Sequence, residues 1–158
     1  MPEELKPVGP ERTEFGWLRA LDKRYPLLLY WGPPVVWAAL IFYLSSQSGE
    51  AFPDVTFLPN ADKAVHVLEY ALLAGLVARA LFNYAWRTHT VSASIVSLVI
   101  CFVFGVLNEL HQLSVPDRSF EWGDLGADAV GIGLGILIYV LIQLKSAKRK
   151  SASREEAL

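Results

Sequence analysis

Four apolar stretches, each about twenty residues long, constrain the fold of this chain more than any other feature. They cover residues 27–46, 64–84, 91–110 and 125–144. The hydrocarbon core of a bilayer is about 30 Å thick, and a helix that rises about 1.5 Å per residue crosses it in about twenty residues. Because unpaired backbone groups are costly in lipid, we expect all four stretches to be helical. The sequence therefore predicts an all-α protein, a four-transmembrane-helix up-down bundle.

Composition supports the same class of protein and excludes others. Of the 158 residues, 53% are hydrophobic and only 19% are charged, which is the balance of a membrane protein about one domain long. The formal net charge is −2, so no nucleic-acid partner is expected. The single cysteine, Cys101, lies inside an apolar stretch. This leaves neither a disulfide framework nor a cysteine-based zinc site.

The regions outside the stretches divide the chain into three parts. Residues 1–26 form a cytoplasmic or interfacial leader, residues 27–144 the membrane domain, and residues 145–158 a basic cytoplasmic tail, of which we expect 146–158 to be solvated and partly disordered. Within the leader, apolar residues recur at helical spacing at Phe15, Trp17, Leu18 and Leu21. This pattern favours an amphipathic helix at the membrane interface, and a loosely ordered leader is the alternative.

Lysine and arginine residues predict how the bundle lies in the membrane. Those near the ends of the stretches are Arg19, Lys23, Arg24, Arg87, Lys145, Lys148, Arg149 and Lys150, whereas the two remaining loops hold only Lys63 and Arg118. The positive-inside rule then places both termini and the loop 85–90 in the cytoplasm, and loops 47–61 and 113–123 outside. Because the first stretch follows a long charged leader, we expect a retained span and not a cleaved signal peptide. Pro33 and Pro34 should either start its regular helix or kink it.

Ionisable and amide side chains gather at the outward ends of the second, third and fourth stretches. An ionisable side chain costs roughly 2.5–3.5 kcal/mol at the centre of a membrane helix, so several at one depth need an explanation. On the second stretch, one face carries Asp62, His66, Glu69 and Tyr70. These four residues fall within an arc of about 100° on a helix, and the spacing of His66 and Glu69 allows them to pair.

The third and fourth stretches each carry a matching face. On the third, small and polar residues form the stripe Cys101, Gly105, Asn108 and Gln112, with Glu109 beside it. On the fourth, two acids are continued by two glycines, in the order Asp124, Asp128, Gly131 and Gly135. Such faces are typical of helix contacts in lipid, and the glycine pair fits packing within one chain or between two. We expect the three faces to meet in an outward-facing polar pocket around Glu69, Glu109 and Asp128.

Several of these residues also have a plainer interpretation. Asp124 is equally well placed to cap the fourth helix, and His111 lies off the centre of its stripe, where a role at the rim is as well supported as one in the pocket. Tyr70 fits an interfacial anchor, and four tryptophans near the ends of the stretches are expected to be belt residues, namely Trp31, Trp37, Trp86 and Trp122. The acids could also form a purely structural network with His66 and Arg118.

The same residues carry a resemblance to a known family. The ordered motifs are Phe42-Tyr43-Leu44-Ser45-Ser46-Gln47-Ser48, Asp62-Lys63-Ala64-Val65-His66 with Glu69-Tyr70, Asn108-Glu109-Leu110-His111-Gln112, Pro116-Asp117-Arg118, Asp124 and Asp128-Ala129-Val130-Gly131. In this order they resemble the VanZ-like family of small four-spanning bacterial membrane proteins, named for a member linked to teicoplanin resistance. The resemblance implies a multi-pass protein of the bacterial cytoplasmic (inner) membrane. The chain departs from the family at Asn108, Asp117 and Asp128, where an acid, a glycine and an asparagine are often found.

A binding function is the first hypothesis for the pocket. Under this hypothesis the chain is a cell-envelope accessory protein that binds a lipid headgroup, a lipid-linked cell-wall precursor or an amphiphilic glycopeptide drug. Arg118 would contact a phosphate group of the ligand. The candidate ligand-binding residues are Ser45, Ser46, Gln47, Asp62, His66, Glu69, Tyr70, Asn108, Glu109, Gln112, Arg118, Asp124 and Asp128. Because acids outnumber Arg118, they would repel an anionic headgroup unless a divalent cation or proton uptake intervenes.

The alternative is a membrane-embedded enzyme acting on a lipid-linked substrate. Its catalytic residues would be His66, Glu69, Glu109 and Asp128, since a buried carboxyl group can hold a proton for acid/base work. No HExxH or paired Glu-x-x-His spacing occurs, so no metal or other cofactor is expected, although the same four residues would ligate a divalent cation in a metal-assisted version. A proton or ion pathway is disfavoured, because the cytoplasmic halves of the last three stretches carry almost nothing ionisable apart from Arg79. Membrane lipids are the expected partners, and no oligomeric state is predicted.

Overall fold

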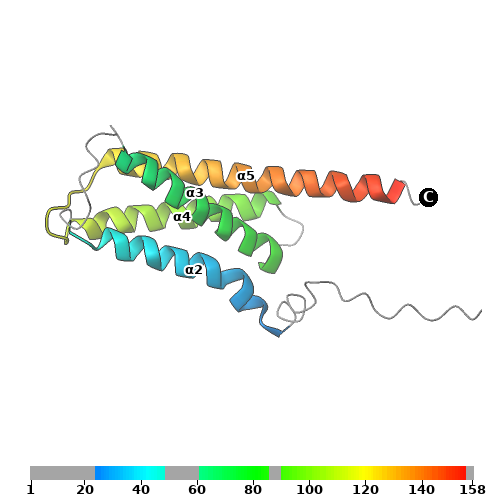
Figure 1. The fold of residues 1–158 in the computed structure, drawn as a ribbon, viewed down its shortest axis with the longest axis horizontal. Helices are drawn as coiled ribbons and strands as arrows, with labels where there is room; N and C mark the ends of the chain where they lie inside the picture. Colours follow the sequence, from blue (N-terminus) through cyan, green and yellow to red (C-terminus); the bar gives the residue numbers. More distant parts are fainter. Residues whose placement is uncertain (1–23, 49–60, 86–89, 156–158) are drawn as a thin grey trace, which may run out of the picture.

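The computed structural model describes residues 24–48, 61–85 and 90–155, and these residues are almost entirely helical (Figure 1). The elements are α2 (Pro26–Ser45), α3 (Ala61–Ala80), a π-helical turn η2 (Leu81–Ala85) that continues α3, α4 (Thr90–Gln112) and α5 (Trp122–Glu155). No strand occurs among the described residues, and their four long helices are each long and apolar enough to cross a membrane. The predicted all-α class and four-span count are confirmed. The predicted leader helix and Trp86 lie outside the described residues.

The helices extend beyond the apolar stretches that predicted them. α4 continues to Gln112, and α5 begins at Trp122 and runs to Glu155 without a break. The expectation of a partly disordered tail is therefore wrong for residues 146–155, which are helical, with 146–149 and 151–155 exposed. Their composition explains the difference, since alanine, lysine, arginine and glutamate propagate a helix that is already nucleated. Hydropathy marks where a helix meets hydrocarbon and not where it ends.

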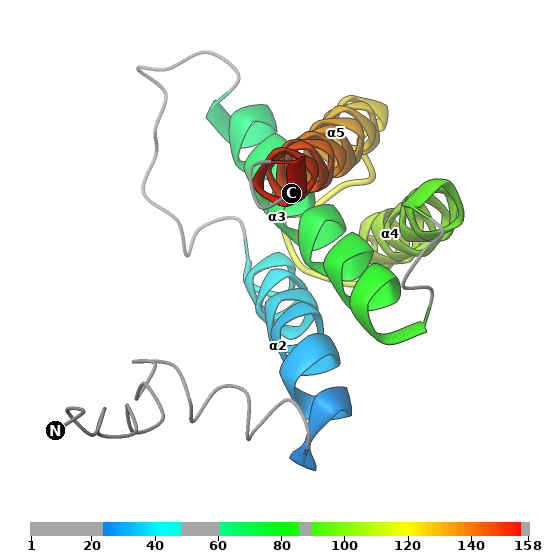
Figure 2. The same cartoon turned by 90° about the vertical axis from the view of Figure 1, so that its right-hand side faces the viewer.

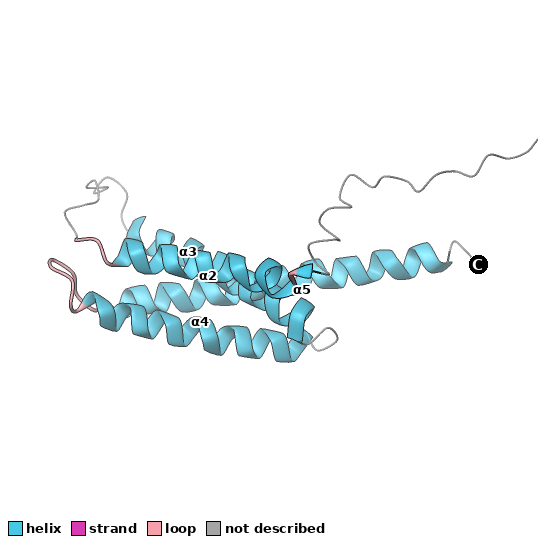
Figure 3. Cartoon of the chain, turned by 90° about the horizontal axis from the view of Figure 1, so that it is seen from below, coloured by secondary structure: helices cyan, strands magenta, loops and turns pink. Residues whose placement is uncertain are grey.

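The helices run alternately up and down, so two chain connections meet at the same end of the bundle. At this end, which we call the polar end, α2 and α4 finish and α3 and α5 begin (left in Figure 1). Figure 2 views the bundle along its length and shows α3 between α2, α4 and α5, and α3 packs against all three. Its contact with α5 is by far the most extensive. At the opposite end, α5 extends past the other helices (Figure 3).

Two glycines account for the closeness of α3 and α5. A Cβ atom added at Gly131 would collide with the backbone carbonyl of Val67, and one added at Gly135 would collide with the carbonyl of Ala71. Only a residue without a side chain allows the two backbones to approach this far. The glycine face therefore packs within one chain, which resolves the alternative that the sequence left open.

Away from the polar end, the interior of the bundle consists mostly of apolar side chains. Its buried side chains include Ile41, Leu73, Val77, Cys101 and Ile132, and partly buried residues such as Trp31 and Trp37 pack against them. Ser97 is buried there too, and its hydroxyl donates to the carbonyl of Ala74 at 2.9 Å. Many large apolar side chains instead face outward, among them Leu28, Leu68, Val91 and Leu107. Large apolar side chains on the outer surface are unusual for a protein in water, but they are expected where the helices face the hydrocarbon of a membrane.

The prolines of the first helix occupy two kinds of position. Pro26 lies in the first turn of α2, where its missing amide hydrogen has no partner to lose. Pro33 and Pro34 lie inside α2, so they do not start the helix. Near this end, Tyr25, Leu28, Leu29 and Pro33 line an apolar surface pocket of about 210 Å³. This pocket is at the other end of α2 from the predicted polar site.

Candidate functional site

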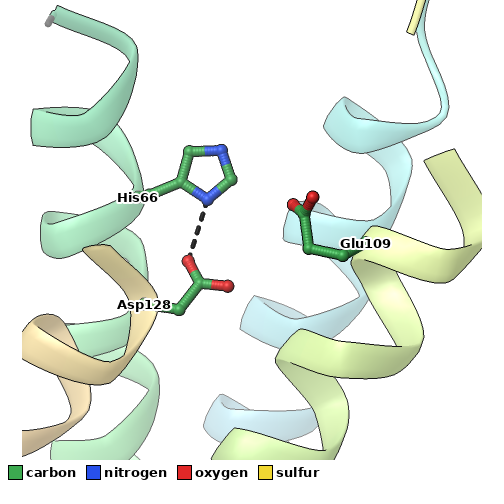
Figure 4. Close-up of side chains that lie close together, drawn as sticks. All are labelled: His66, Glu109 and Asp128. Atoms are coloured by element: carbon green, nitrogen blue, oxygen red, sulfur yellow. Dashed lines mark hydrogen bonds and ion pairs between the residues drawn. The ribbon is translucent and has the colours of Figure 1, made fainter. Parts of the chain in front are cut away.

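Three helices each contribute one ionisable side chain to a compact group at the polar end. His66 comes from α3, Glu109 from α4 and Asp128 from α5, and one nitrogen or oxygen atom of each lies within 4.8 Å of the others (Figure 4). We call this group the three-helix cluster. Nδ1 of His66 is hydrogen-bonded to Oδ1 of Asp128 at 2.8 Å. Both carboxylates are fully buried and the His66 side chain is only 15% exposed.

Glu109 is held in place by neutral donors. The side-chain amide of Gln112, one turn further along α4, donates to Oε1 at 3.4 Å, and the backbone N–H of Glu121 donates to Oε2 at 3.2 Å. Both carboxylate oxygens thus have a hydrogen bond without an ion pair. A buried charge that has only neutral partners keeps a large share of its desolvation cost. The position of Glu109 is fixed, while its charge still lacks an opposite charge among these partners.

Three buried polar atoms around the cluster have no hydrogen-bond partner among the described residues. They are the hydroxyl of Tyr70, Oδ1 of Asn108 and Oδ2 of Asp128. Asp128 Oδ2 and the Tyr70 ring both lie close to Gly105, where an added Cβ would meet them at 3.0 and 3.3 Å. Because an unsatisfied buried polar group costs about 1–3 kcal/mol, three of them at one place are unusual.

A second charged group, which we call the lysine cluster, lies beside the first. Its centre is Lys63, whose Nζ donates to Asp124 at 2.7 Å, to Asp62 at 3.1 Å and to Glu121 at 3.4 Å. The clusters touch where His66 Nε2 lies 3.7 Å from Asp124 Oδ2. Asp124 therefore pairs with Lys63 in the first turn of α5, in place of the capping role that was the alternative. Sequence reasoning missed Lys63 and Glu121 as parts of the site.

The end of α2 closes the same region from a third side. The side-chain amide of Asn108 donates to the Ser45 hydroxyl at 2.8 Å, and the Ser46 hydroxyl lies 3.1 Å from Nε2 of His111. The ring of Phe42 stacks on His111 with centroids 4.5 Å apart, which places this histidine at the rim. Arg118 Nε donates to the backbone carbonyl of Gln47 at 3.3 Å and so ties the loop after α4 to α2.

Some of the predicted residues are arranged differently from the prediction. His66 contacts Asp128 and Asp124, and the predicted pair with Glu69 is not among its hydrogen bonds or ion pairs. Glu69 is partly buried and is not a member of the three-helix cluster. Its backbone carbonyl accepts a 3.0 Å hydrogen bond from the indole of Trp37, so Trp37 is not simply a belt residue. Tyr70 is fully buried and is no interfacial anchor, whereas Trp122 is 78% exposed.

The chemistry of the region is that of a site for a cation or a polar group. The two clusters bring together five carboxylates, those of Asp62, Glu109, Glu121, Asp124 and Asp128, with Lys63 and His66 as the bases that contact them. Neutral donors and acceptors from Ser45, Asn108 and Gln112 adjoin them. Such a set can ligate a metal ion, move a proton, or hydrogen-bond a sugar or phosphate headgroup.

Comparison with known proteins adds one match. A family model described as VanZ/LLP1 matches residues 30–143, which include every residue of the two clusters. Neither curated proteins nor solved structures give a match.

Proposed function

The chain belongs to the VanZ/LLP1 family, and on this premise we propose that it is a cell-envelope accessory protein that binds the polar headgroup of a lipid-linked molecule. Its four apolar helices make it a multi-pass membrane protein. The proposed binding site is the polar end of the bundle. The observation that carries the proposal is the convergence of buried polar side chains from three helices, three of whose polar atoms have no hydrogen-bond partner among the described residues.

Buried polar groups are retained where they have a task or a partner. Asn108, Glu109 and Asp128 are buried almost completely, and apolar residues would pack there at less cost. The atoms without partners include two acceptors, Asn108 Oδ1 and Asp128 Oδ2, and one hydroxyl, that of Tyr70. A headgroup rich in hydroxyl and amide groups supplies the donors and acceptors that they lack.

The surroundings favour a ligand that is itself anchored in the membrane. Val65 and Leu68 flank His66 and Glu69 on α3, and Leu107 and Leu110 flank Asn108 and Glu109 on α4. All four apolar side chains are exposed on the outside of the bundle. An amphiphile can lay its hydrocarbon chains along these residues while its headgroup reaches the polar end.

The proposal includes an orientation. Lys145, Lys148 and Arg149 lie on the part of α5 that is remote from the polar end. The positive-inside rule therefore puts both termini in the cytoplasm and the polar end on the outer side of the inner membrane. Cysteine replacements test this topology: Ser114→Cys near the polar end should react with an impermeant thiol reagent in intact cells, and Ser151→Cys only after lysis.

Binding of a lipid-linked probe to the purified protein tests the function. The protein in nanodiscs of neutral lipid is titrated with an isoprenyl phosphate, a lipid-linked disaccharide-peptide and an amphiphilic glycopeptide, and affinity is measured by microscale thermophoresis. We expect one of these probes to bind, and Asn108→Ala to weaken it about tenfold or more, since one hydrogen bond from a buried amide is worth about 1.4 kcal/mol. The identity of the probe that binds decides between a cell-envelope lipid and a drug.

Matched variants keep this test specific. Asn83→Ala removes an amide from the far end of α3, where Asn83 donates to the carbonyl of Arg79, and should leave binding unchanged. Glu155→Gln, in the exposed end of α5, serves as the control for Glu109→Gln. If Asn108→Ala and Glu109→Gln bind every probe as tightly as these controls do, the polar end is not a headgroup site.

A second candidate function is favoured by one contact. His66 is hydrogen-bonded to the buried carboxylate of Asp128 at 2.8 Å, an arrangement that orients an imidazole for general acid/base catalysis. The function would then be an enzyme that acts on the same lipid-linked molecules. Product analysis separates the two functions, because Asp128→Asn in an enzyme should abolish turnover of a probe that still binds.

A further inference from the structure

The three-helix cluster places more negative charge in the interior than its histidine can balance. Glu109 and Asp128 are both completely buried inside the bundle. A protonated His66 would offset the negative charge of only one of them. Two buried carboxylates within 4.8 Å of each other repel strongly in a medium of low dielectric constant. A stable arrangement of this kind calls for a further positive charge.

The nearest lysine is engaged with other acids. Lys63 Nζ contacts Asp62, Glu121 and Asp124, which form the other acid group close enough to hold an ion. In that group an ammonium already occupies the position of a cation. Among residues 24–48, 61–85 and 90–155, the hydrogen-bond donors to Glu109 are the neutral side-chain amide of Gln112 and the N–H of Glu121.

One oxygen in the cluster is ready to act as a ligand. Asp128 uses Oδ1 for His66, while Oδ2 is buried without a hydrogen-bond partner in the part of the chain that the structure describes. In Figure 4, Oδ2 points to the side on which the Glu109 carboxylate lies. This orphaned oxygen is independent of the charge argument, and it indicates that something other than the protein completes its coordination.

From these observations we propose that His66, Glu109 and Asp128 bind a divalent transition-metal ion. Ligand atoms about 2.1 Å from a tetrahedral ion lie about 3.4 Å apart, so a group already within 4.8 Å closes around an ion by rotations of its side chains. The hydrogen bond between His66 Nδ1 and Asp128 Oδ1 is then replaced by a bond from each group to the ion, with the imidazole proton held on Nε2 beside Asp124. One imidazole with two carboxylates suits Zn²⁺ or Mn²⁺, whereas Mg²⁺ and Ca²⁺ prefer sites made of oxygen alone. Glu69 is not a ligand in this site.

The neighbouring residues have the form of a supporting shell. Gln112 and the N–H of Glu121 each hold one oxygen of Glu109, and Asp124 approaches the other nitrogen of His66. Groups of this kind orient metal ligands, and their loss weakens metal binding by about 10- to 100-fold. Three protein ligands also leave a coordination position open, as in catalytic zinc sites.

An ion with an open coordination position would explain how the proposed site binds a headgroup, and this role of the ion rests on the proposed function. It would accept a phosphate oxygen from a headgroup that the surrounding acids otherwise repel. Metal binding is nevertheless measurable without any headgroup, so the two proposals succeed or fail separately.

The test is a metal titration of the full chain in neutral detergent, after chelator treatment and without added lipid. Calorimetry and elemental analysis with Zn²⁺ and with Mn²⁺ should show one ion per chain for one of the two metals. Glu109→Gln and Asp128→Asn should each weaken its affinity by more than about 100-fold, and Gln112→Ala by about tenfold. The controls are Glu155→Gln and Asp117→Asn, because Asp117 has a φ of 60° that asparagine also accepts.

Folding is monitored in the same samples. The ion should raise the melting temperature of the wild-type chain and of the controls but not that of Glu109→Gln, so a variant that folds poorly is distinguished from one that lacks a ligand. Stoichiometric binding that these variants leave unchanged would overturn the proposal, and so would the absence of binding in wild type. If wild type binds no ion, headgroup binding that persists in chelator would show that the metal inference alone had failed and that the proposed function still holds.

Discussion

The two halves of the α3–α5 contact are built from opposite materials. Toward the polar end, His66 and Asp128 face each other across side chains of ordinary length, with buried charge and polar atoms that lack partners. About one and two turns deeper, Gly131 and Gly135 bring the backbones of the same two helices together with no side chain between them. The deeper half gains contact area and leaves little polar surface to satisfy. We therefore expect the fold to depend on the glycine half, and the polar half, which we propose to be the binding site, to cost stability.

The largest expected effect breaks the glycine half. Gly135→Val adds atoms where the carbonyl of Ala71 already lies, so α3 and α5 must separate and stability should fall by more than about 3 kcal/mol. The monodisperse fraction in size-exclusion chromatography and the melting temperature measure this loss. Gly133→Val is the matched control, because a Cβ at Gly133 meets nothing within 4 Å. Equal behaviour of the two variants would refute the close contact.

Removing the lysine of the polar half should have a smaller effect. Lys63→Met leaves the largely buried Asp124 without its ammonium partner, and we expect a loss of about 1–2 kcal/mol because Lys63 is itself a third exposed. Thermal unfolding in detergent measures it, with Lys145→Met as the exposed control. Adding Asp124→Asn should recover part of the loss, and additive effects would show that the two residues do not interact.

Neutralising an acid of the three-helix cluster should change stability in the opposite direction. In chelator, Glu109→Gln removes a buried charge while keeping its shape and one acceptor, so the melting temperature should rise by the equivalent of about 1 kcal/mol. Differential scanning fluorimetry against Glu155→Gln provides the comparison. A clear fall would mean that the cluster is a structural network, as the plainer interpretation of the sequence held.

The smallest effect belongs to a polar group inside the apolar half. Ser97→Ala removes the 2.9 Å hydrogen bond from α4 to the carbonyl of Ala74, and bonds of this kind between membrane helices average about 0.6 kcal/mol. Chemical unfolding with a graded denaturing detergent resolves a difference of this size, with Ser151→Ala in the exposed end of α5 as control. A loss several times larger would show that this half also relies on polar contacts.

The sequence predicted the fold well because hydropathy and the needs of the backbone in lipid act locally. All four spans and their alternating directions agree with the structure. The errors lie at helix ends, as at Glu155, where the apolar signal has already stopped and helix propensity continues. Whether Gly131 and Gly135 pack within the chain depended on the tertiary fold, which no local pattern contains.

The site could be predicted by its faces but not by its pairs. The predicted pocket was centred on Glu69, Glu109 and Asp128; the structure buries Glu109 and Asp128 together with Asn108, but Glu69 is only partly buried and is not a member of the three-helix cluster. The partner of His66 was wrong, since i, i+3 spacing suggested Glu69 within α3, whereas the crossing of α3 and α5 supplies Asp128. Lys63 was used as a charge for membrane orientation and as part of the family motif, but not as a site residue. Its place next to Asp62, one turn before His66, was the available signal that it belongs to the site.

One continuous helix carries acids of both clusters and also leaves the bundle at the other end. α5 holds Asp124 and Asp128 in its first two turns and continues to Glu155, a length of about 51 Å at about 1.5 Å per residue. A continuous helix tilts as a rigid body, because no loop between its two ends can absorb the movement. Any rotation of α5 about Gly131 and Gly135, where α3 touches it most closely, must therefore swing its last turns in the opposite sense to its first. A ligand bound at the polar end could in this way displace the last turns of α5 on the other side of the membrane.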